Sequence, residues 1–164
     1  KARFVGITGL PLRLFREVME QVDVDQIQSY CRYCLNDQAL ADHLPYFKAK
    51  GVGVFNSAPI AMRLLSLEGP PHWHPAPAEL KARCAEAARL CAERGGDLSR
   101  LALQFSVAHP DIATTIVGTA TPARIVQNIR DAAHPPDEDL LRSVLDVLRP
   151  VRNVTWSSGR PENN

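Results

Sequence analysis

The hydrophobic positions of the chain fall into short continuous runs that alternate with longer stretches of helical spacing. Short apolar runs predict buried strands, and apolar side chains that recur three or four residues apart predict amphipathic helices. The predicted strands are residues 4–7, 25–30, 52–55 and 112–117, and the predicted helices are residues 11–21, 37–50, 78–94, 97–109, a helix that opens at 121, and 136–148. Continuous apolar strands separated by helices are typical of a parallel sheet covered on both faces. The pattern therefore predicts an α/β protein.

Several predicted helix ends coincide with residues that stop or start helices. Gly51 follows the helix over 37–50, and glycine commonly closes a helix in the left-handed conformation. Asp97 is expected to cap the next-but-one helix with its carboxylate. Thr121 and Pro122 are expected to be the N-cap and first residue of the helix that follows the last strand.

Two architectures fit this order of elements, and periodicity does not separate them. One is an open doubly wound sheet with helices on both faces. The other is half of a (β/α)8 barrel, in which consecutive parallel strands lie side by side. The chain has no G-x-G-x-x-G fingerprint, which disfavours the doubly wound sheet if the protein binds a dinucleotide.

The composition is that of an ordinary globular domain with little net charge. The 164 residues are 45% hydrophobic and 23% charged, and 19 basic residues against 18 acidic ones give a net charge of +1. We therefore expect neither nucleic acid nor a membrane surface as a partner. Four cysteines in a chain of this composition do not suit a disulfide scaffold, so we expect reduced thiols in a cytoplasmic protein.

The amino terminus resembles the interior of a longer chain. Lys1 is followed directly by strand-like sequence, and no apolar stretch with a small-residue cleavage site makes this region a signal peptide. We expect the sequence to be a piece of a longer protein, with one folded unit over residues 1–148 and a tail over 149–164.

Four potential metal ligands lie in two short motifs. Cys31 and Cys34 form a C-x-x-C pair, and His72 and His74 lie in a proline-rich loop. Thiolates and imidazoles are the ligands that zinc prefers, but an H-x-H in such a loop is not a recognised partner of this pair. Packing is the favoured interpretation, and no metal site is expected. The pair is also a poor redox motif, because it follows a strand directly instead of opening a helix.

The segment over residues 115–129 carries the strongest chemical signal. A predicted strand ends in Gly118 and Thr119, and a capped helix follows a short loop. Free backbone N–H groups and the helix dipole at such a junction favour phosphate binding. The polar side chains that share one face of this helix are Arg124, Gln127 and Asn128. The alternative interpretation is a solvated face of an amphipathic helix.

This segment resembles the C-terminal end of the aldo-keto reductases, whose eighth strand and following helix carry a G-T-x-x-P-x-R-x-x-x-N type pattern that holds the adenosine end of NAD(P). Three further segments match that family in the expected order. FVGITGL (4–10) is similar to the fifth strand, QIQSY (26–30) to the sixth, and GVGVFNSAPIA (51–61) to the seventh and its turn. The motifs GITGLP, SYCRYCLND, LPYFKAKGVGV, GPPHWHPAP and LALQFSVAHP are most similar to the sugar-dehydrogenase branch of the family.

The resemblance implies that the chain is the C-terminal half of a TIM barrel, strands five to eight, with the site at the carboxyl ends of the strands. It implies NAD as cofactor, with NADP less favoured, and a free aldose oxidised at C1 to a lactone as substrate. It also implies the missing N-terminal half-barrel as a partner. The residues that it implies for cofactor binding are Thr8, Gly9, Gln28, Ser57, Ala58, Pro59, Ile60, Gly118, Thr119, Arg124, Gln127 and Asn128.

The chain departs from the family pattern in three respects. The catalytic Asp, Tyr, Lys and His of the family lie on the first four strands, so no catalytic residue is assigned here and the chain alone is expected to be inactive. Ser57 stands where many members stack a tyrosine on the nicotinamide, and Thr8-Gly9 stands where many have Ser-Asn. A non-catalytic half-barrel that binds a nucleotide or a partner protein is the alternative function.

Overall fold

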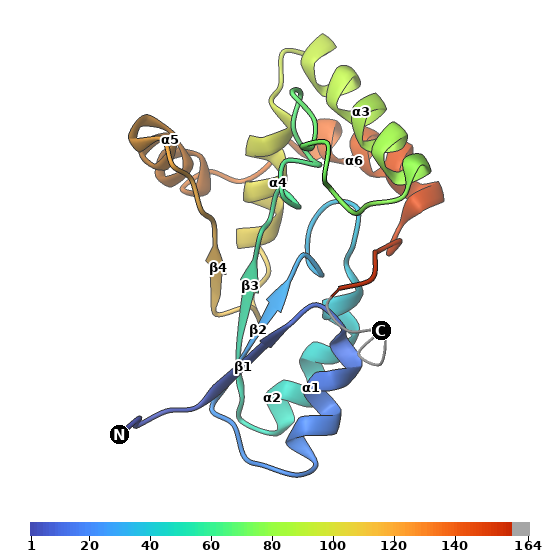
Figure 1. Cartoon of the computed structure of the whole chain (residues 1–164). Helices are drawn as coiled ribbons and strands as arrows, with labels where there is room; N and C mark the ends of the chain where they lie inside the picture. Colours follow the sequence, from blue (N-terminus) through green and yellow to red (C-terminus); the bar gives the residue numbers. More distant parts are fainter. Residues whose placement is uncertain (159–164) are drawn as a thin grey trace.

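The computed structural model describes residues 1–158 and contains a four-stranded parallel sheet (Figure 1). The strands are β1 (Gly6–Gly9), β2 (Gln26–Tyr30), β3 (Gly53–Ser57) and β4 (Thr114–Ile116). The helices are α1 (Leu12–Met19), α2 (Leu44–Ala49), α3 (Ala78–Glu93), α4 (Leu98–Val107), α5 (Pro122–Ala132) and α6 (Glu138–Leu148), with the 3-10 segments η1 (Ala39–His43) and η2 (Arg149–Val151). None of the helices described is long and apolar enough to cross a membrane. The α/β class with a parallel sheet is confirmed.

The strands lie side by side in chain order, β1-β2-β3-β4, and every neighbouring pair is parallel. A doubly wound sheet reverses its direction of growth at one strand and binds ligands at that point. The sheet described here grows in one direction only, as consecutive strands of a (β/α)8 barrel do. Its strand order therefore favours the barrel over the doubly wound sheet.

Helices cover only one face of the sheet. Ile27 and Val54 are buried on that face against α1 and α2. On the opposite face Thr8 is exposed, and Gln28 and Phe55 are only half-buried. The expectation that both faces are covered is wrong for this chain. A single covered face is what the wall of a barrel presents when the opposite wall is not present.

The predicted helix over residues 37–50 is wrong as a single element. The structure has η1 followed by the short helix α2, and Pro45 lies in the first turn of α2. Proline has no N–H, so a continuous helix through this position would lose a backbone hydrogen bond. Gly51 ends α2 with a φ of +69°, as predicted.

Two predicted strands shift in the structure. The first, predicted at residues 4–7, is observed at Gly6–Gly9, and the last, predicted at 112–117, is reduced to Thr114–Ile116. Each is an edge strand with one neighbour, so its hydrogen-bonded ladder is shorter than its apolar run. Phe4 and Val5 are consequently exposed.

A second core lies among α3, α4 and α6, away from the cluster under the sheet. Cys84 and Cys91 are fully buried in it, as small hydrophobic residues of α3, and burial raises the pKa of the Cys84 thiol to about 12. Asp97 caps α4 by accepting hydrogen bonds from the N–H groups of Ser99 and Arg100 at 2.7 and 3.1 Å. The predicted N-cap is confirmed.

The described part of the C-terminal segment packs against the chain that leaves β2. Asn153 N–H donates to the backbone oxygen of Asn36 at 2.9 Å, and Asn153 Oδ1 accepts from the N–H of Gln38 at 2.8 Å. Val151 and Trp156 are buried. Residues 149–158 are therefore docked, and the remainder of the predicted tail, residues 159–164, lies outside the described residues.

Candidate cofactor site

Two side chains predicted for the nicotinamide end of a cofactor meet at the carboxyl ends of β2 and β3. The Gln28 amide Nε2 donates to the Ser57 hydroxyl at 3.4 Å, and Ser57 Oγ donates in turn to the backbone oxygen of Ser29 at 3.1 Å. Ser57 is buried, whereas Gln28 is half-buried on the open face of the sheet. This contact orients the Gln28 amide and leaves its carbonyl oxygen and second N–H for another partner.

Thr8 and Gly9 point to opposite faces of β1. Thr8 is the partner of Gln28 in the sheet register and lies beside it on the open face. Gly9 pairs with Ser29 on the helix-covered face, where a Cβ would lie 3.8 Å from the ring of Phe15. The sheet therefore places the side chain of Thr8, but not that of residue 9, with Gln28.

The chain that leaves β3 makes a left-handed turn without glycine. Ala61, Met62 and Arg63 have φ values of 47°, 53° and 71° in succession. This conformation costs a non-glycine residue about 1–2 kcal/mol. The turn is closed by a hydrogen bond from the Leu64 N–H to the oxygen of Ala61 at 3.0 Å and by another from Ser66 Oγ to the oxygen of Arg63 at 2.9 Å. The surrounding structure thus holds a strained segment in place.

His74 holds the start of this turn from the loop before α3. The Ala76 N–H donates to His74 Nδ1 at 3.1 Å, so the ring proton is on Nε2, which donates to the oxygen of Ala61 at 3.1 Å. The ring of Trp156 packs edge-on against His74, with centroids 5.0 Å apart. Burial lowers the pKa of His74, which fits a neutral ring with both nitrogens in use. His74 has a structural role, whereas its neighbour Trp73 is exposed.

We expect His74→Ala to lower the free energy of unfolding by about 1–3 kcal/mol, because two buried hydrogen bonds are lost. The matched control His72→Ala, at an exposed position, should change the free energy of unfolding by less than about 0.5 kcal/mol.

Stability should also depend on pH through His74, because the fold lowers the pKa of this residue. Below the pKa of an unfolded histidine, about 6.5, the unfolded chain binds more protons than the folded chain, so stability should fall as the pH decreases below that value. Urea unfolding at a series of pH values tests this. An equal loss in both variants, or a pH profile that His74→Ala leaves unchanged, would contradict it.

A cavity of about 450 Å³ lies between the strained turn, α4 and the junction of β4 with α5. The predicted cofactor residues that line it are Ile60, Gly118, Thr119, Arg124 and Asn128. Further polar lining residues are Thr121, predicted as the N-cap, and four residues that the sequence did not indicate, Arg63, Ser66, Glu68 and Ser99. The fold thus brings five of the predicted cofactor residues into one concave site, four of them from the segment over residues 115–129.

The three remaining predicted residues, Ala58, Pro59 and Gln127, do not line this cavity. The Ala58 N–H donates to the oxygen of Ile116 at 3.1 Å and so joins the loop after β3 to the end of β4. Gln127 Nε2 donates to Asp131 Oδ1 at 2.8 Å on the exposed surface of α5. Contact of any of the twelve residues with a cofactor stays a prediction.

No described side chain crowds the backbone where β4 leads into α5. A Cβ added to Gly118 would meet no atom within 4 Å. Thr121 is the N-cap of α5 as predicted, but its side chain makes no capping hydrogen bond. Instead its N–H donates to Thr119 Oγ1 at 3.1 Å. Gly118 therefore leaves space beside the start of α5, with a hydroxyl group at its edge.

The C-x-x-C pair forms a buried corner where the chain leaves β2. Burial raises the pKa of the Cys31 thiol to about 12, and it also raises the pKa of Cys34. Cys34 Sγ donates to Asn36 Oδ1 at 3.3 Å, and the Arg32 guanidinium pairs with Asp37 at 3.2 Å. Over residues 1–158, no three His, Cys, Asp or Glu side chains gather as metal ligands. The thiols of this corner are protonated packing groups.

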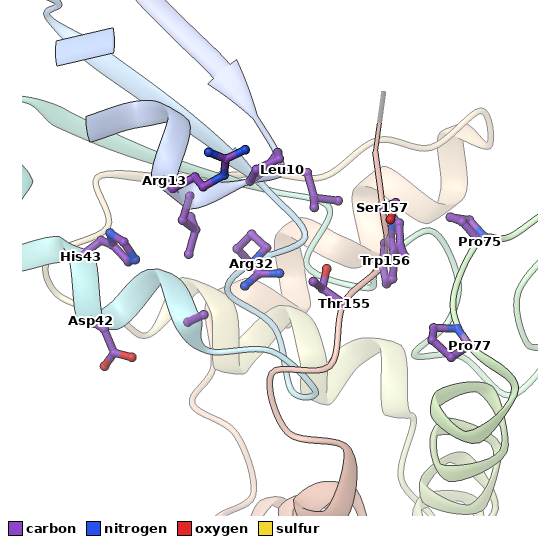
Figure 2. Close-up of a pocket in the computed structure, with 13 residues that line it drawn as sticks. Leu10, Arg13, Arg32, Asp42, His43, Pro75, Pro77, Thr155, Trp156 and Ser157 are labelled. Carbon is purple, nitrogen blue, oxygen red and sulfur yellow. The ribbon is translucent and has the colours of Figure 1, made fainter. Parts of the chain in front are cut away.

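A larger cavity of about 790 Å³ lies elsewhere, between α1, η1 and the docked C-terminal segment. Figure 2 shows Arg32 near its centre, His43 toward one end, and Pro75 and Pro77 toward the other. None of the twelve residues predicted for cofactor binding lines it. The predicted adenosine-end residues therefore belong to the smaller cavity.

Known proteins resemble this chain over most of its length. The model of the aldo/keto reductase family matches residues 1–147. L-galactose dehydrogenase of Arabidopsis thaliana is 43% identical over 170 residues, which cover 99% of this chain and 53% of that protein. Pyridoxal 4-dehydrogenase of Microbacterium luteolum is 30% identical over 71% of this chain and 36% of that protein. The chain thus spans about half the length, or less, of these curated relatives.

Solved structures share the fold. Aldo-keto reductase AKR11C1 from Bacillus halodurans, in its holo form, superposes with a TM-score of 0.67 at 22% identity, over 95% of this chain and 52% of that one. Glycerol dehydrogenase AKR11B4 from Gluconobacter oxydans gives a TM-score of 0.60 at 15% identity, over 96% of this chain and 52% of that one. The likeness covers about half of each enzyme. From the match to the family model over residues 1–147, the chain belongs to the aldo/keto reductase family.

Proposed function

We propose that this chain is the C-terminal half of an NAD(P)-dependent aldo/keto reductase that oxidises a free aldose at C1 to its lactone. In that half, β1 to β4 are strands five to eight of the barrel. The observation that carries the proposal is the cavity at the ends of β3 and β4, where five residues predicted for the cofactor meet. The 43% identity to L-galactose dehydrogenase supports L-galactose or a similar aldose as substrate.

The residues of the chain fit a dinucleotide that lies across the ends of the strands. The cavity offers guanidinium, amide and hydroxyl groups, and Arg124 and Asn128 of α5 line it at the proposed adenosine end. At the other end the Gln28 amide, oriented by Ser57, has hydrogen-bonding groups for the carboxamide of the nicotinamide. Arg63, from the loop after β3, also lines the cavity.

A bound nicotinamide would supply the hydride acceptor for the oxidation of the sugar C1 to a lactone carbonyl, in which C1 gives up a hydride and its hydroxyl group a proton. The part of this chain in that reaction is to hold the cofactor. Gln28 fixes the orientation of the nicotinamide ring, and Arg124 and Asn128 hold the distant adenosine. Such positioning accelerates the reaction because the reacting atoms meet already aligned.

Turnover tests the proposal in the full-length protein, which here means the product of the complete reading frame that contains these 164 residues. A panel of free aldoses is offered with NAD and with NADP, and formation of reduced nicotinamide is followed. We expect turnover with L-galactose or an aldose of similar configuration. Reduction of neither dinucleotide by any aldose, at sugar concentrations that saturate sugar dehydrogenases, would contradict the proposal.

We expect the full-length protein to prefer NAD to NADP. The loop after β4, residues 118–121, carries no cation for the 2′-phosphate of NADP, and a charge-assisted hydrogen bond is worth roughly 1.5–3 kcal/mol, or about 10- to 100-fold in discrimination. Ala120→Arg should shift kcat/KM toward NADP, because residue 120 lines the cavity. The same substitution at exposed Ala82 of α3 is the control. A preference of the unchanged protein for NADP would refute this expectation.

A half-barrel that binds a nucleotide or a partner protein without catalysis is the alternative, favoured by the guanidinium, amide and hydroxyl groups of the smaller cavity, which suit a nucleotide whether or not a reaction follows. The two functions are distinguished by the reading frame upstream of Lys1. An aspartate and a tyrosine five residues apart, followed by a lysine and a histidine, support the enzyme, and their absence supports the binding module.

A further inference from the structure

The backbone oxygen of Ala61 joins the left-handed turn to the loop before α3. It accepts one hydrogen bond inside the turn, from the Leu64 N–H at 3.0 Å, and a second from His74 Nε2 at 3.1 Å. Ala61 is fully buried, and His74 is also buried. The second bond therefore connects two segments that are 13 residues apart, at a point shielded from water.

The conformation of this turn determines where part of the wall of the smaller cavity lies. Ile60 precedes the turn and Arg63 ends it, and both line the cavity. Residues other than glycine adopt the left-handed conformation only where other contacts hold them, because their Cβ atoms strain it. A bond that holds Ala61 thus also holds the lining residues on either side of it.

His74 is itself held on several sides. The Ala76 N–H fixes its tautomer, and Lys81 Nζ of α3 donates to its backbone oxygen at 2.6 Å. The ring of Trp156 packs edge-on against it, and the exposed ring of Trp73 lies with its centroid 6.4 Å away. Of these groups, Trp156 is the one that comes from the docked C-terminal segment.

Trp156 links the C-terminal segment to the same set of contacts. It is buried, and it lines the larger cavity together with Pro75 and Pro77 of the loop before α3 (Figure 2). The segment is anchored by its hydrogen bonds to the chain after β2. Packed groups therefore run without interruption from this segment through Trp156 and His74 to Ala61, beside the smaller cavity.

We propose that His74 is a positioning residue for the smaller cavity, and that Trp156 of the C-terminal segment influences cofactor affinity through it. The inference rests on the proposed function, because only a ligand in the smaller cavity responds to the position of its wall. Neither residue is among the described residues that line this cavity, so the effect is indirect. His74 keeps the turn in one conformation, and a dinucleotide then binds without having to order it.

Two substitutions of His74 in the full-length protein separate positioning from general stability. The amide of glutamine reaches the position of Nε2 and can still donate to Ala61, whereas the amide of asparagine reaches only the position of Nδ1 and can still accept from Ala76. Each variant loses one buried hydrogen bond, so the melting temperature without cofactor should fall by about 2–4 °C in both. The Kd for NADH and for NADPH, followed by nicotinamide fluorescence, should rise about 5-fold in His74→Asn and less than about 2-fold in His74→Gln.

A second pair of variants lies in the C-terminal segment and tests the inference even if a His74 variant does not fold. Trp156→Leu removes the ring that packs against His74 and should raise both Kd values about 3-fold. Arg152→Ala is the matched control. The Arg152 side chain is exposed and donates to Gln38 Oε1 at 3.3 Å, away from His74, so its loss should change neither Kd.

The remaining outcomes count against the inference. An equal rise in Kd in His74→Asn and His74→Gln overturns it, because the loss then follows stability and not the bond to Ala61. Unchanged Kd values in His74→Asn and Trp156→Leu also overturn it, while the proposed function stands if the unchanged protein binds a dinucleotide. A rise confined to His74→Asn overturns the role of Trp156. If the unchanged protein binds neither NADH nor NADPH, the proposed function fails as well.

Discussion

The 164-residue chain alone should show no sugar-dependent reduction of NAD or NADP, while the full-length protein turns over. If the chain is strands five to eight, as proposed, the family resemblance implies that the proton-transfer residues lie on the other four strands. Loss of a general acid or base typically costs about 10²–10⁴-fold in rate, and loss of the opposite wall of the site adds to that. We therefore expect the activity of the isolated chain to be below detection.

The tyrosines of the chain support this expectation. Burial, with a further contribution from the neighbouring Cys31, raises the pKa of Tyr30 to about 12, and burial also raises the pKa of Tyr33. Both shifts move the phenol away from the pKa near neutrality that suits proton transfer. The third tyrosine, Tyr46, lies on α2, and the guanidinium carbon of Arg16 is 4.6 Å from the centre of the Tyr46 ring.

The measurement compares isolated chain and full-length protein, prepared and assayed alike with NAD and an aldose. The variants Tyr30→Phe and Tyr33→Phe of the isolated chain are the internal controls. Formation of reduced nicotinamide by the isolated chain that depends on the sugar and disappears in either variant would overturn the assignment of catalysis to residues outside this chain.

The isolated chain should also associate in solution, whereas the full-length protein should not expose the same surfaces. β1 and β4 each have one neighbour, and unpaired strand edges join to other chains. α5 lies beyond β4 at the side of the molecule (Figure 1) and packs against α4, where Gln104 Nε2 donates to the oxygen of Asp131 at 3.2 Å. Its side chains Val126 and Ile129 are 48% and 67% exposed, so an apolar helix face is left uncovered beside an open edge.

Light scattering coupled to size exclusion is the measurement, and we expect a dimer or larger species. Val126→Glu should weaken the association, because it places a carboxylate on the uncovered face of α5. Val22→Glu, at a position of similar exposure on the connection between α1 and β2, is the matched control. A monodisperse monomer with a cooperative melt would show that the half-barrel is stable by itself.

The sequence predicted those features that depend on local signals. Asp97 caps α4 because its carboxylate reaches two N–H groups of the next turn, and Gly51 ends α2 because it adopts a positive φ. The position of Gln28 beside Ser57 follows from two adjacent parallel strands, which the apolar runs indicated.

Other features depend on contacts that a one-dimensional pattern does not contain. The left-handed turn at Ala61, Met62 and Arg63 contains no glycine from which its positive φ values could be predicted. It is held by groups distant in the sequence, such as His74. For that reason Arg63 was not among the predicted site residues. The exposure of the open face of the sheet could not be predicted from the sequence either. The apolar runs of a barrel strand are the same whether or not the opposite wall is present.

We infer that the cavity between β3, α4 and α5 holds the adenosine of a nicotinamide dinucleotide, with the nicotinamide at Gln28. A crystal structure of the full-length protein with bound NAD tests it most directly. We expect the adenosine beside Arg124 and Asn128, and the carboxamide hydrogen-bonded to the Gln28 amide that Ser57 orients. Density for the dinucleotide in the larger cavity around Arg32, or at any site that leaves Gln28 and Arg124 without contact, would contradict it.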